Sequence, residues 1–475
     1  MAGIKFGTDG WRAVISEDFT FENVKRVAQA IADYVKSERP ILKERQFKLA
    51  VGYDTRFLSR TYAGLVASVL GANGIKVILT DRPTPTPSIS YAIKDRNLFG
   101  GVMITASHNP AQYNGIKYKA YYGGSAMPEI TERIEYFLSR QKNINYGPLD
   151  EFKAKGFVKT EDMLPRHLEF IKNYVNLNLL KKAGFKLFVD SMYGTGNGYI
   201  AQILKGGKGK VETMHGGINP GFDGINPEPK LPNLNELVKK VKLHGYDIGI
   251  ATDGDADRVG IASRTGKLLT GHKIMALLLL HLLEDRHMTG GVIQTVCGTV
   301  LIERIAQRFG LKTYETPVGF KYISDIMRNE DILLGGEETG GVQFKDSIPE
   351  RDGILSGLLI LEMMAMRKKP LEAIIKDIDR KFGTFEYRRL DIKYPDEKKQ
   401  LLMKALKRDP LDKILGKRVA EIKDIDGYKF ICEDSTWLML RLSGTEPILR
   451  VYAEAPTEKT ALKILRFGKR LAYSI

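Results

Sequence analysis

Short apolar segments alternate with amphipathic segments through the first three quarters of the chain, and this alternation constrains the fold more than any other feature. The first round predicts strands at 47–53, 75–80 and 99–104, with helices at 60–73 and 131–141. An amphipathic helix at 21–35, with Thr20 as its cap, precedes them, and the proline-rich run at 82–87 is interpreted as a stiff connection. Strands that alternate with helices in this way are typical of α/β domains. The sequence therefore predicts an α/β domain at its start.

Two further rounds of strands and helices follow, and the pattern then changes. Strands are predicted at 185–190 and 246–251 in the second round, after a helix at 166–182, and at 291–296 and 332–334 in the third. The last quarter carries short strands close together, at 428–432, 437–441 and 448–453, which is typical of an antiparallel α+β domain. The predicted domains are 1–150, 151–258, 259–380 and 381–475.

Size, charge and cysteine content limit the classes of function. The 475 residues are too many for one hydrophobic core, which agrees with several domains. No run of roughly 18 apolar residues is present, so no membrane partner is expected. Cys297 and Cys432 lie far apart, which favours a reducing, cytoplasmic setting.

The net charge of +16 is spread along the chain, and no recognised nucleic-acid module is present. A small anionic substrate is therefore the preferred explanation of the charge, and no nucleic-acid partner is expected.

The segment TASHNP at 105–110 follows the predicted strand at 99–104. Its small residues allow close approach of a ligand to the backbone, and ligands bind at strand ends in α/β folds. Ser107 and His108 supply polar groups at this position. Taken alone, the segment fits an ordinary polar surface loop equally well.

The segment DGDADR at 253–258 ends the strand predicted at 246–251. Asp253, Asp255 and Asp257 alternate along it, and their mutual repulsion would be relieved by a bound divalent cation. A few carboxylate oxygens suit Mg²⁺, which often takes a substrate phosphate as a further ligand. An acidic surface turn is the alternative. The glycine-rich turn YGTGNG at 193–198 is interpreted as a close-packing element rather than as a phosphate site.

Three later loops carry polar groups suited to a sugar phosphate. GGEETGG at 335–341 offers glutamates to sugar hydroxyls, and TPVGFKY at 316–322 presents Lys321 from a predicted loop. RLSGTEPILR at 441–450 places two arginines around hydroxyl and backbone N–H groups, an arrangement that binds phosphate. Flexible acidic or structural turns remain the alternatives for each loop taken alone.

Together and in this order, FGTDGWR at 6–12, TASHNP with NGIK after it, DGDADR, GGEETGG and RLSGTEP resemble the α-D-phosphohexomutase superfamily. The resemblance covers nearly the whole chain, from residue 6 to residue 454. It implies three related α/β domains with mixed sheets and a C-terminal α+β domain similar to TATA-binding protein, arranged around a central cleft. It further implies a monomer or homodimer that acts on small-molecule hexose phosphates.

The resemblance also implies the chemistry and the residues that perform it. A phosphoryl group moves between the 1- and 6-positions of a hexose phosphate through phosphorylated Ser107, with glucose 1,6-bisphosphate as intermediate and activator. Mg²⁺ is held by the three aspartates and a Ser107 phosphate oxygen, and Lys117, with a pKa lowered by neighbouring cations, is the candidate for proton handling. The remaining implied residues are Arg12, His108 and Arg258 around the reacting group, and Lys321, Glu337, Thr339, Arg441, Ser443, Gly444, Thr445 and Arg450 around the substrate.

The chain departs from many relatives in the sugar-reading loop. Thr339 stands where many have serine, and Gly341 where many have histidine, so the choice of sugar is the feature placed in doubt. The pair Glu337-Glu338 resembles the glucomutase branch, which favours glucose, with mannose as a second substrate. The alternatives are a phosphoglucosamine mutase and a Mg²⁺-dependent sugar phosphatase.

Overall fold

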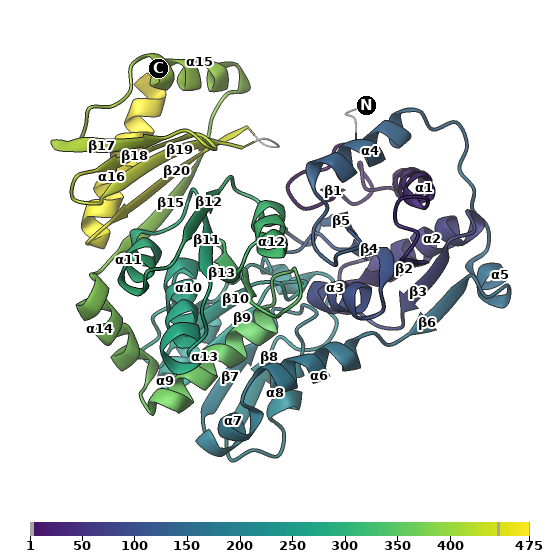
Figure 1. Cartoon of the computed structure of the whole chain (residues 1–475), viewed down its shortest axis with the longest axis horizontal. Helices are drawn as coiled ribbons and strands as arrows, with labels where there is room; N and C mark the ends of the chain where they lie inside the picture. The colour runs from purple at the N-terminus through teal and green to yellow at the C-terminus, as the bar shows by residue number, and fades with distance from the viewer. Residues whose placement is uncertain (1–3, 444–446, 475) are drawn as a thin grey trace.

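A computed structural model of the chain describes residues 4–443 and 447–474 (Figure 1). The described strands form four sheets, one for each predicted domain, and the sheets follow one another along the chain. The first three combine parallel strands with one antiparallel strand at or next to an edge, and the fourth is antiparallel. The prediction of three mixed α/β domains and a C-terminal α+β domain is confirmed. The boundaries between them and the central cleft stay predictions.

The first sheet has the order β1-β5-β4-β2-β3-β6. Strands β2, β3, β4 and β6 run parallel, while β5 is antiparallel to β4 and β1 is antiparallel to β5. Strand β6 lies beyond the predicted boundary at residue 150, yet it pairs with β3 of this sheet. The strands span Trp11–Val14 (β1), Gln46–Tyr53 (β2), Lys76–Thr80 (β3), Leu98–Ile104 (β4), Tyr113–Lys119 (β5) and Val158–Glu161 (β6).

The second and third sheets repeat a shorter version of this plan. Their orders are β10-β9-β7-β8 and β12-β11-β13-β14, and in each sheet the last strand along the chain is antiparallel to its neighbour. The second sheet contains Lys186–Asp190 (β7), Lys210–Met214 (β8), Ile248–Thr252 (β9) and Val259–Ser263 (β10). The third contains Gly291–Thr295 (β11), Thr313–Thr316 (β12), Ile332–Gly336 (β13) and Val342–Phe344 (β14).

The C-terminal sheet has the order β15-β20-β19-β18-β17-β16, and helix α16 packs against its strands β15, β19 and β20. Figure 1 shows it as a separate layer in yellow and green at one end of the molecule. The strands span Glu386–Lys393 (β15), Lys413–Ile414 (β16), Lys417–Lys423 (β17), Tyr428–Cys432 (β18), Trp437–Leu442 (β19) and Ile448–Ala455 (β20).

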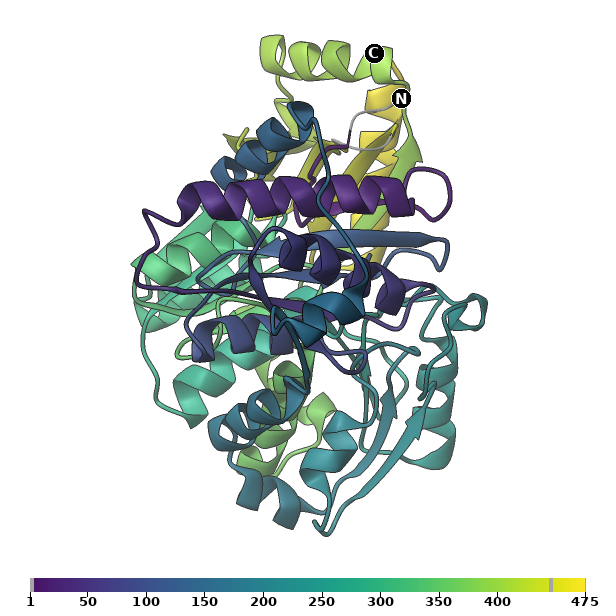
Figure 2. The same cartoon turned by 90° about the vertical axis from the view of Figure 1, so that its right-hand side faces the viewer.

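Helices cover the sheets of all four units (Figures 1 and 2). Helix α1 is the long helix across the first unit in Figure 2, and the side chain of Thr20 caps it by accepting from the Asn23 N–H, as predicted. No helix within the described ranges is both long and apolar enough to span a bilayer. The helices of the first unit are Phe21–Glu38 (α1), Ser59–Ala72 (α2), Thr86–Asp95 (α3), Pro128–Ser139 (α4) and Leu149–Ala154 (α5). The others are Leu164–Tyr174 (α6), Leu177–Ala183 (α7), Tyr199–Leu204 (α8), Phe222–Gly224 (η1), Asn235–His244 (α9), Gly271–Leu280 (α10), His281–Asp285 (η2), Val300–Phe309 (α11), Phe320–Asn329 (α12), Gly353–Arg367 (α13), Leu371–Phe382 (α14), Asp396–Arg408 (α15) and Glu458–Ser474 (α16).

Several local predictions differ from the structure. Helix α3 begins at Thr86, inside the proline-rich stretch predicted as a stiff connection, because a proline in the first helical turn costs no hydrogen bond. The single helix predicted at 166–182 is two helices, since the side chain of Asn176 caps a new start at Leu177. Lys321 lies in the first turn of α12 rather than in a loop.

Candidate active site

Four of the loops singled out in the sequence each join two neighbouring antiparallel strands of one sheet. TASHNP joins β4 to β5, DGDADR joins β9 to β10, GGEETGG joins β13 to β14, and RLSGTEP joins β19 to β20. Ser107 of the first loop donates to Asp253 of the second. Arg351 joins the second loop to the third, and the Val259 N–H, directly after the second loop, donates to the Gly340 carbonyl of the third. The fold therefore places the motifs at equivalent positions of the α/β units and brings them together.

Ser107 lies fully buried at the tip of its loop with a left-handed backbone, φ 52°. Its hydroxyl donates to Asp253 Oδ2 over 3.0 Å, and its N–H donates to Thr105 Oγ1 over 2.8 Å. A positive φ at a non-glycine residue is uncommon and persists where the surroundings hold it. Arg56 supplies that hold, because its Nη2 donates to the carbonyl oxygens of Ser107 and Asn109 at 2.7 and 2.6 Å. Arg56 is a further site residue that no sequence motif marks.

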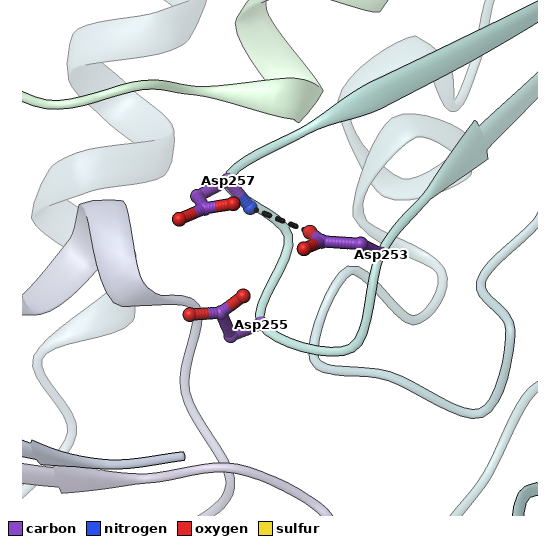
Figure 3. Close-up of side chains that lie close together, drawn as sticks. All are labelled: Asp253, Asp255 and Asp257. Carbon is purple, nitrogen blue, oxygen red and sulfur yellow. Dashed lines mark hydrogen bonds between the residues drawn. The ribbon is translucent and has the colours of Figure 1, made fainter. Parts of the chain in front are cut away.

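The three aspartates gather within the curve of the β9–β10 loop (Figure 3). One carboxylate oxygen from each lies within 4.8 Å of the others, and all three side chains are fully buried. Among the described residues, Asp255 Oδ1 and Asp257 Oδ1 find no hydrogen-bond partner. Buried carboxylate oxygens without partners are costly, and a hard cation satisfies them. The arrangement fits a divalent metal ion.

Close backbone packing fixes this loop against its neighbours. A Cβ at Gly254 would lie 2.5 Å from the Ser107 carbonyl oxygen, so only glycine allows the two loops to touch. A Cβ at Gly194 would lie 2.6 Å from the Asp253 carbonyl oxygen, and the Thr195 N–H donates to Gly254. The YGTGNG turn thus packs against the aspartate loop, which supports its interpretation as a packing element.

Charge is unevenly balanced among the aspartates. Burial, together with the carboxylates of Asp257 and Asp255, raises the pKa of Asp253 well above its usual value. Burial also opposes ionisation of Asp255, but the nearby Lys117 ammonium outweighs it and lowers the pKa of Asp255. Without a bound cation among the three carboxylates, a negative charge on Asp253 is strongly unfavourable.

We predict that Asp253→Asn stabilises the metal-free protein at neutral pH. Folding raises the pKa of Asp253 above its unfolded value of about 3.9, so the protonated carboxyl group stabilises the native state most at a pH below that unfolded value. This stabilisation is lost as the pH rises through the folded pKa, and at pH 7 a buried carboxylate without a cation destabilises the fold. In chelator, the variant should unfold at a higher temperature than the parent at pH 7, with the difference shrinking as pH falls. Thermal unfolding measured across this range checks it, and a less stable variant at pH 7 would contradict the charge balance described above.

Lys117, on β5, lies among carboxylates rather than among cations. Its Nζ is 2.8 Å from both Asp9 Oδ2 and Asp255 Oδ2, and 3.4 Å from Asp257 Oδ2. Burial disfavours the charged lysine, but these three carboxylates outweigh it and raise the pKa of Lys117. The predicted lowering of this pKa is wrong for these surroundings. Lys117 keeps its proton here and acts as a hydrogen-bond donor and a positive charge.

Arg351 joins the aspartate loop to the β13–β14 loop and lies outside the motifs singled out in the sequence. Its Nη2 contacts Asp257 Oδ2 at 2.6 Å and Asp9 Oδ2 at 3.1 Å, and its Nη1 donates to Glu337 Oε2 at 3.0 Å. Asp9 was missed as well, although it lies in the motif that contains Arg12. The signal for Arg351 is a charged residue just before the capped start of α13.

The other predicted residues of the reacting region lie around the same loops. Arg12, on β1, donates from Nη1 to Asn109 Oδ1 over 2.7 Å, and the Arg258 N–H donates to Asp253 Oδ1 over 3.2 Å. Burial and the nearby Arg258 and Arg12 lower the pKa of His108 well below its usual value, so this imidazole is neutral. These side chains add positive charge and a neutral ring beside Ser107.

The predicted substrate residues lie in two places. Glu337 and Thr339 belong to the β13–β14 loop, and the buried Thr339 hydroxyl has no hydrogen-bond partner among the described residues. Arg441 and Arg450 stand directly opposite each other on β19 and β20, and the Ser443 N–H donates to the Ile448 carbonyl. Gly444 and Thr445 lie outside the described residues.

Family models match all four units of the chain. They are described as phosphoglucomutase/phosphomannomutase α/β/α domains I, II and III, over residues 3–145, 165–266 and 270–382, and the C-terminal domain over 392–466. The phosphoglucomutase/phosphomannomutase of Thermococcus kodakarensis is 32% identical over 470 residues, covering 99% of this chain and 98% of the relative. The chain belongs to this family. The phosphoglucosamine mutase of Methanococcus aeolicus is also similar, 31% identical over 481 residues, with 98% and 97% of the two chains covered.

Solved structures agree with this phosphohexomutase family. A protein of Thermus thermophilus, described as a phosphomannomutase, matches with a TM-score of 0.87 and 32% identity over 99% of both chains. The protein is thus an isomerase that transfers a phosphoryl group within a hexose phosphate. Its relatives are divided among glucose, mannose and glucosamine phosphates, so family membership alone does not identify the sugar.

Proposed function

We propose that this phosphohexomutase interconverts glucose 1-phosphate and glucose 6-phosphate, with mannose phosphates as a second pair of substrates. The proposed route passes through phosphorylated Ser107 and a 1,6-bisphosphate. The observation that carries it is the 3.0 Å hydrogen bond from the Ser107 hydroxyl to Asp253 of the buried aspartate group. A nucleophile placed beside a charge-neutralising site is what phosphoryl transfer requires.

The residues of the site have different proposed roles. Asp253, Asp255 and Asp257 would hold Mg²⁺, which would neutralise charge on the transferring phosphoryl group. The hydrogen bond from the Ser107 hydroxyl to Asp253 holds Oγ beside the site before it attacks. When Ser107 Oγ bonds to phosphorus of the bisphosphate, the P–O bond to the sugar breaks, and the sugar oxygen that leaves gains the proton that the serine loses. Arg12, Arg258 and Lys117 supply positive charge for the phosphoryl oxygens, and the neutral His108 orients the loop. Lys117 stabilises charge in this account and does not accept the proton.

The C-terminal unit would hold the phosphate that is not reacting. Arg441 and Arg450 lie opposite each other on the neighbouring strands β19 and β20, where two guanidinium groups could bind one phosphate. Arg441 is fixed through Nε, which donates to Asp426 Oδ2 over 2.7 Å, while its buried Nη1 finds no partner within the described chain. Ser443, Gly444 and Thr445 would add donors, and Lys321 would contribute charge from the third unit.

We predict that Arg441→Ala raises KM for glucose 1-phosphate and lowers kcat. Binding at the distant phosphate positions the reacting end, and a charge-assisted contact is worth about 1.5–3 kcal/mol, so kcat/KM should fall roughly ten- to a hundredfold. Free bisphosphate should also escape, making activity depend more on added glucose 1,6-bisphosphate. Steady-state kinetics with and without added bisphosphate measure both effects.

A matched arginine serves as the control for this variant. Arg388 lies on β15 of the same sheet and pairs with Glu458, so Arg388→Ala should keep both constants close to those of the parent. Equal constants for Arg441→Ala and the parent would mean that this loop does not hold the substrate phosphate.

The choice of sugar rests on the β13–β14 loop. Arg351 holds Glu337 through Oε2, and Thr339 keeps the hydroxyl of a serine but adds a methyl group. A panel of the 1-phosphates of glucose, mannose, glucosamine and N-acetylglucosamine tests the proposal. The highest kcat/KM should be for glucose, followed by mannose. A preference for glucosamine would support the phosphoglucosamine mutase alternative, and release of inorganic phosphate as the main product would support the phosphatase alternative.

A further inference from the structure

His167 of the second α/β unit lies fully buried and contacts side chains of the first and third units. On α6, at the start of the second unit, its Nδ1 lies 2.8 Å from Ser88 Oγ on α3, and its Nε2 lies 2.9 Å from Asp352 Oδ2, the residue that caps α13. Helices α3 and α6 pack side by side (Figure 1). The rings of Tyr91 and Phe170 flank the imidazole, with centroids 5.5 and 6.4 Å away. One side chain thus connects all three units.

The hydrogen-bond directions follow from the partners. Asp352 is an acceptor, and its Oδ1 already accepts the Leu355 N–H at the start of α13. His167 Nε2 therefore donates to Asp352, and Nδ1 shares a hydrogen bond with the Ser88 hydroxyl. A bridge between a hydroxyl and a carboxylate on opposite sides needs a ring with a polar atom at each end, which histidine provides.

A serine, a histidine and an aspartate joined by hydrogen bonds also occur in hydrolases, but these three residues do not form such an active site. Ser88 and His167 are 0% exposed and Asp352 is 2% exposed, so a substrate has no access to the hydroxyl. These three residues instead act through the segments next to Ser88 and Asp352.

The segments next to Ser88 and Asp352 both contact aspartates of the site. Thr86, two residues before Ser88, donates from Oγ1 to Asp255 Oδ2 over 2.6 Å, and its N–H donates to the Asp255 carbonyl over 3.0 Å. Arg351, next to Asp352, contacts Asp257 Oδ2 at 2.6 Å. The helix starts that His167 joins therefore carry the side chains that orient two of the three candidate metal ligands.

We propose that His167 is a positioning residue that sets the α3 and α13 helix starts, and through Thr86 and Arg351 the carboxylates of Asp255 and Asp257. The inference rests on the proposed metal site. Partners that orient metal ligands matter nearly as much as the ligands, because a misplaced carboxylate binds the ion poorly. His167 thereby couples the relative placement of three units to the geometry of a site that none of them forms alone.

The test is calorimetric titration of Mg²⁺ into the metal-free full-length protein and its His167→Leu variant. Leucine fills the space but leaves Ser88 and Asp352 without their partner, so the Kd for Mg²⁺ should rise about tenfold. In steady-state assays at a fixed Mg²⁺ concentration, kcat should fall about tenfold while KM for hexose phosphate stays within about twofold. His167→Gln, which keeps a donor for Asp352, should recover part of both losses.

Two further variants separate positioning from a general loss of stability. His281 is equally buried and contacts two carboxylates, Asp285 and Glu362, but no aspartate of the site, so His281→Leu should lower stability while leaving the Kd for Mg²⁺ unchanged. Ser88→Ala removes one link and should raise the Kd about threefold even if His167→Leu does not fold. Ser88→Ala should raise the Kd less in a Thr86→Val variant than in the parent, because Ser88 acts on the metal site through Thr86.

The failures of the two proposals are distinguishable. If the parent binds Mg²⁺ and both Ser88→Ala and His167→Gln bind it equally well, the positioning role is overturned while the metal site stands. If the parent itself binds no Mg²⁺, the metal site fails and the positioning role fails with it.

Discussion

Ser107→Ala should abolish mutase activity while leaving the fold intact. The Ser107 hydroxyl is the nucleophile in this account, and loss of a covalent nucleophile lowers kcat by roughly 10⁴-fold or more. The side chain is small, and within the described ranges its hydroxyl donates to Asp253 alone, so the rest of the site should keep its arrangement. The assay follows glucose 6-phosphate formation from glucose 1-phosphate in the presence of glucose 1,6-bisphosphate and Mg²⁺.

Ser68→Ala is the matched control for this variant. Ser68 is a buried serine of α2 in the same unit, and its hydroxyl donates to the Gly147 carbonyl over 2.5 Å. This variant should retain the activity of the parent. Activity in Ser107→Ala close to that of Ser68→Ala would remove Ser107 from the reaction.

Asp255→Asn should cause the second largest loss. Asp255 accepts from Thr86 and Lys117 through Oδ2, and its Oδ1 is without a hydrogen-bond partner in the described chain, as expected of a metal ligand. A bound metal ion stabilises the transition state by several kcal/mol, so kcat should fall roughly a thousandfold. The same variant should bind Mg²⁺ more weakly in calorimetry, since a hard cation prefers a charged oxygen.

Glu454→Gln separates the loss of this carboxylate from the loss of any buried charge. Glu454 is buried in the C-terminal sheet, where it accepts from the Trp437 indole and the Val300 N–H. Its neutralisation should leave kcat and Mg²⁺ binding unchanged. Full activity of Asp255→Asn, or full activity of the parent after exhaustive chelation, would contradict the metal role.

The sequence predicts the architecture well wherever burial is uniform along a segment. The strand β9 is a continuous apolar run followed by charged residues, and such a run has few alternatives to a central strand. Helix α3 was missed because prolines at 85 and 87 mask a helix start. Strands β15 and β17 were missed because exposed charged residues interrupt their apolar pattern.

The site was predictable only where a motif carries it. Ser107 and the three aspartates stand in compact motifs, and their proximity could be inferred from their positions at strand ends. Arg56, Thr86 and Arg351 act through contacts between segments distant in the chain, and no spacing in one sequence encodes such contacts. The pKa of Lys117 was predicted in the wrong direction for the same reason, because its carboxylate neighbours come from other loops.

Transfer of a labelled phosphoryl group from Ser107 tests the central claim most directly. The protein is labelled with ³²P from labelled glucose 1,6-bisphosphate, mixed with unlabelled glucose 6-phosphate and Mg²⁺, and quenched within the first turnover. The label should leave Ser107 and appear first in hexose bisphosphate, before it appears in the monophosphate. Label released as inorganic phosphate, or turnover without label ever residing on Ser107, would contradict the account.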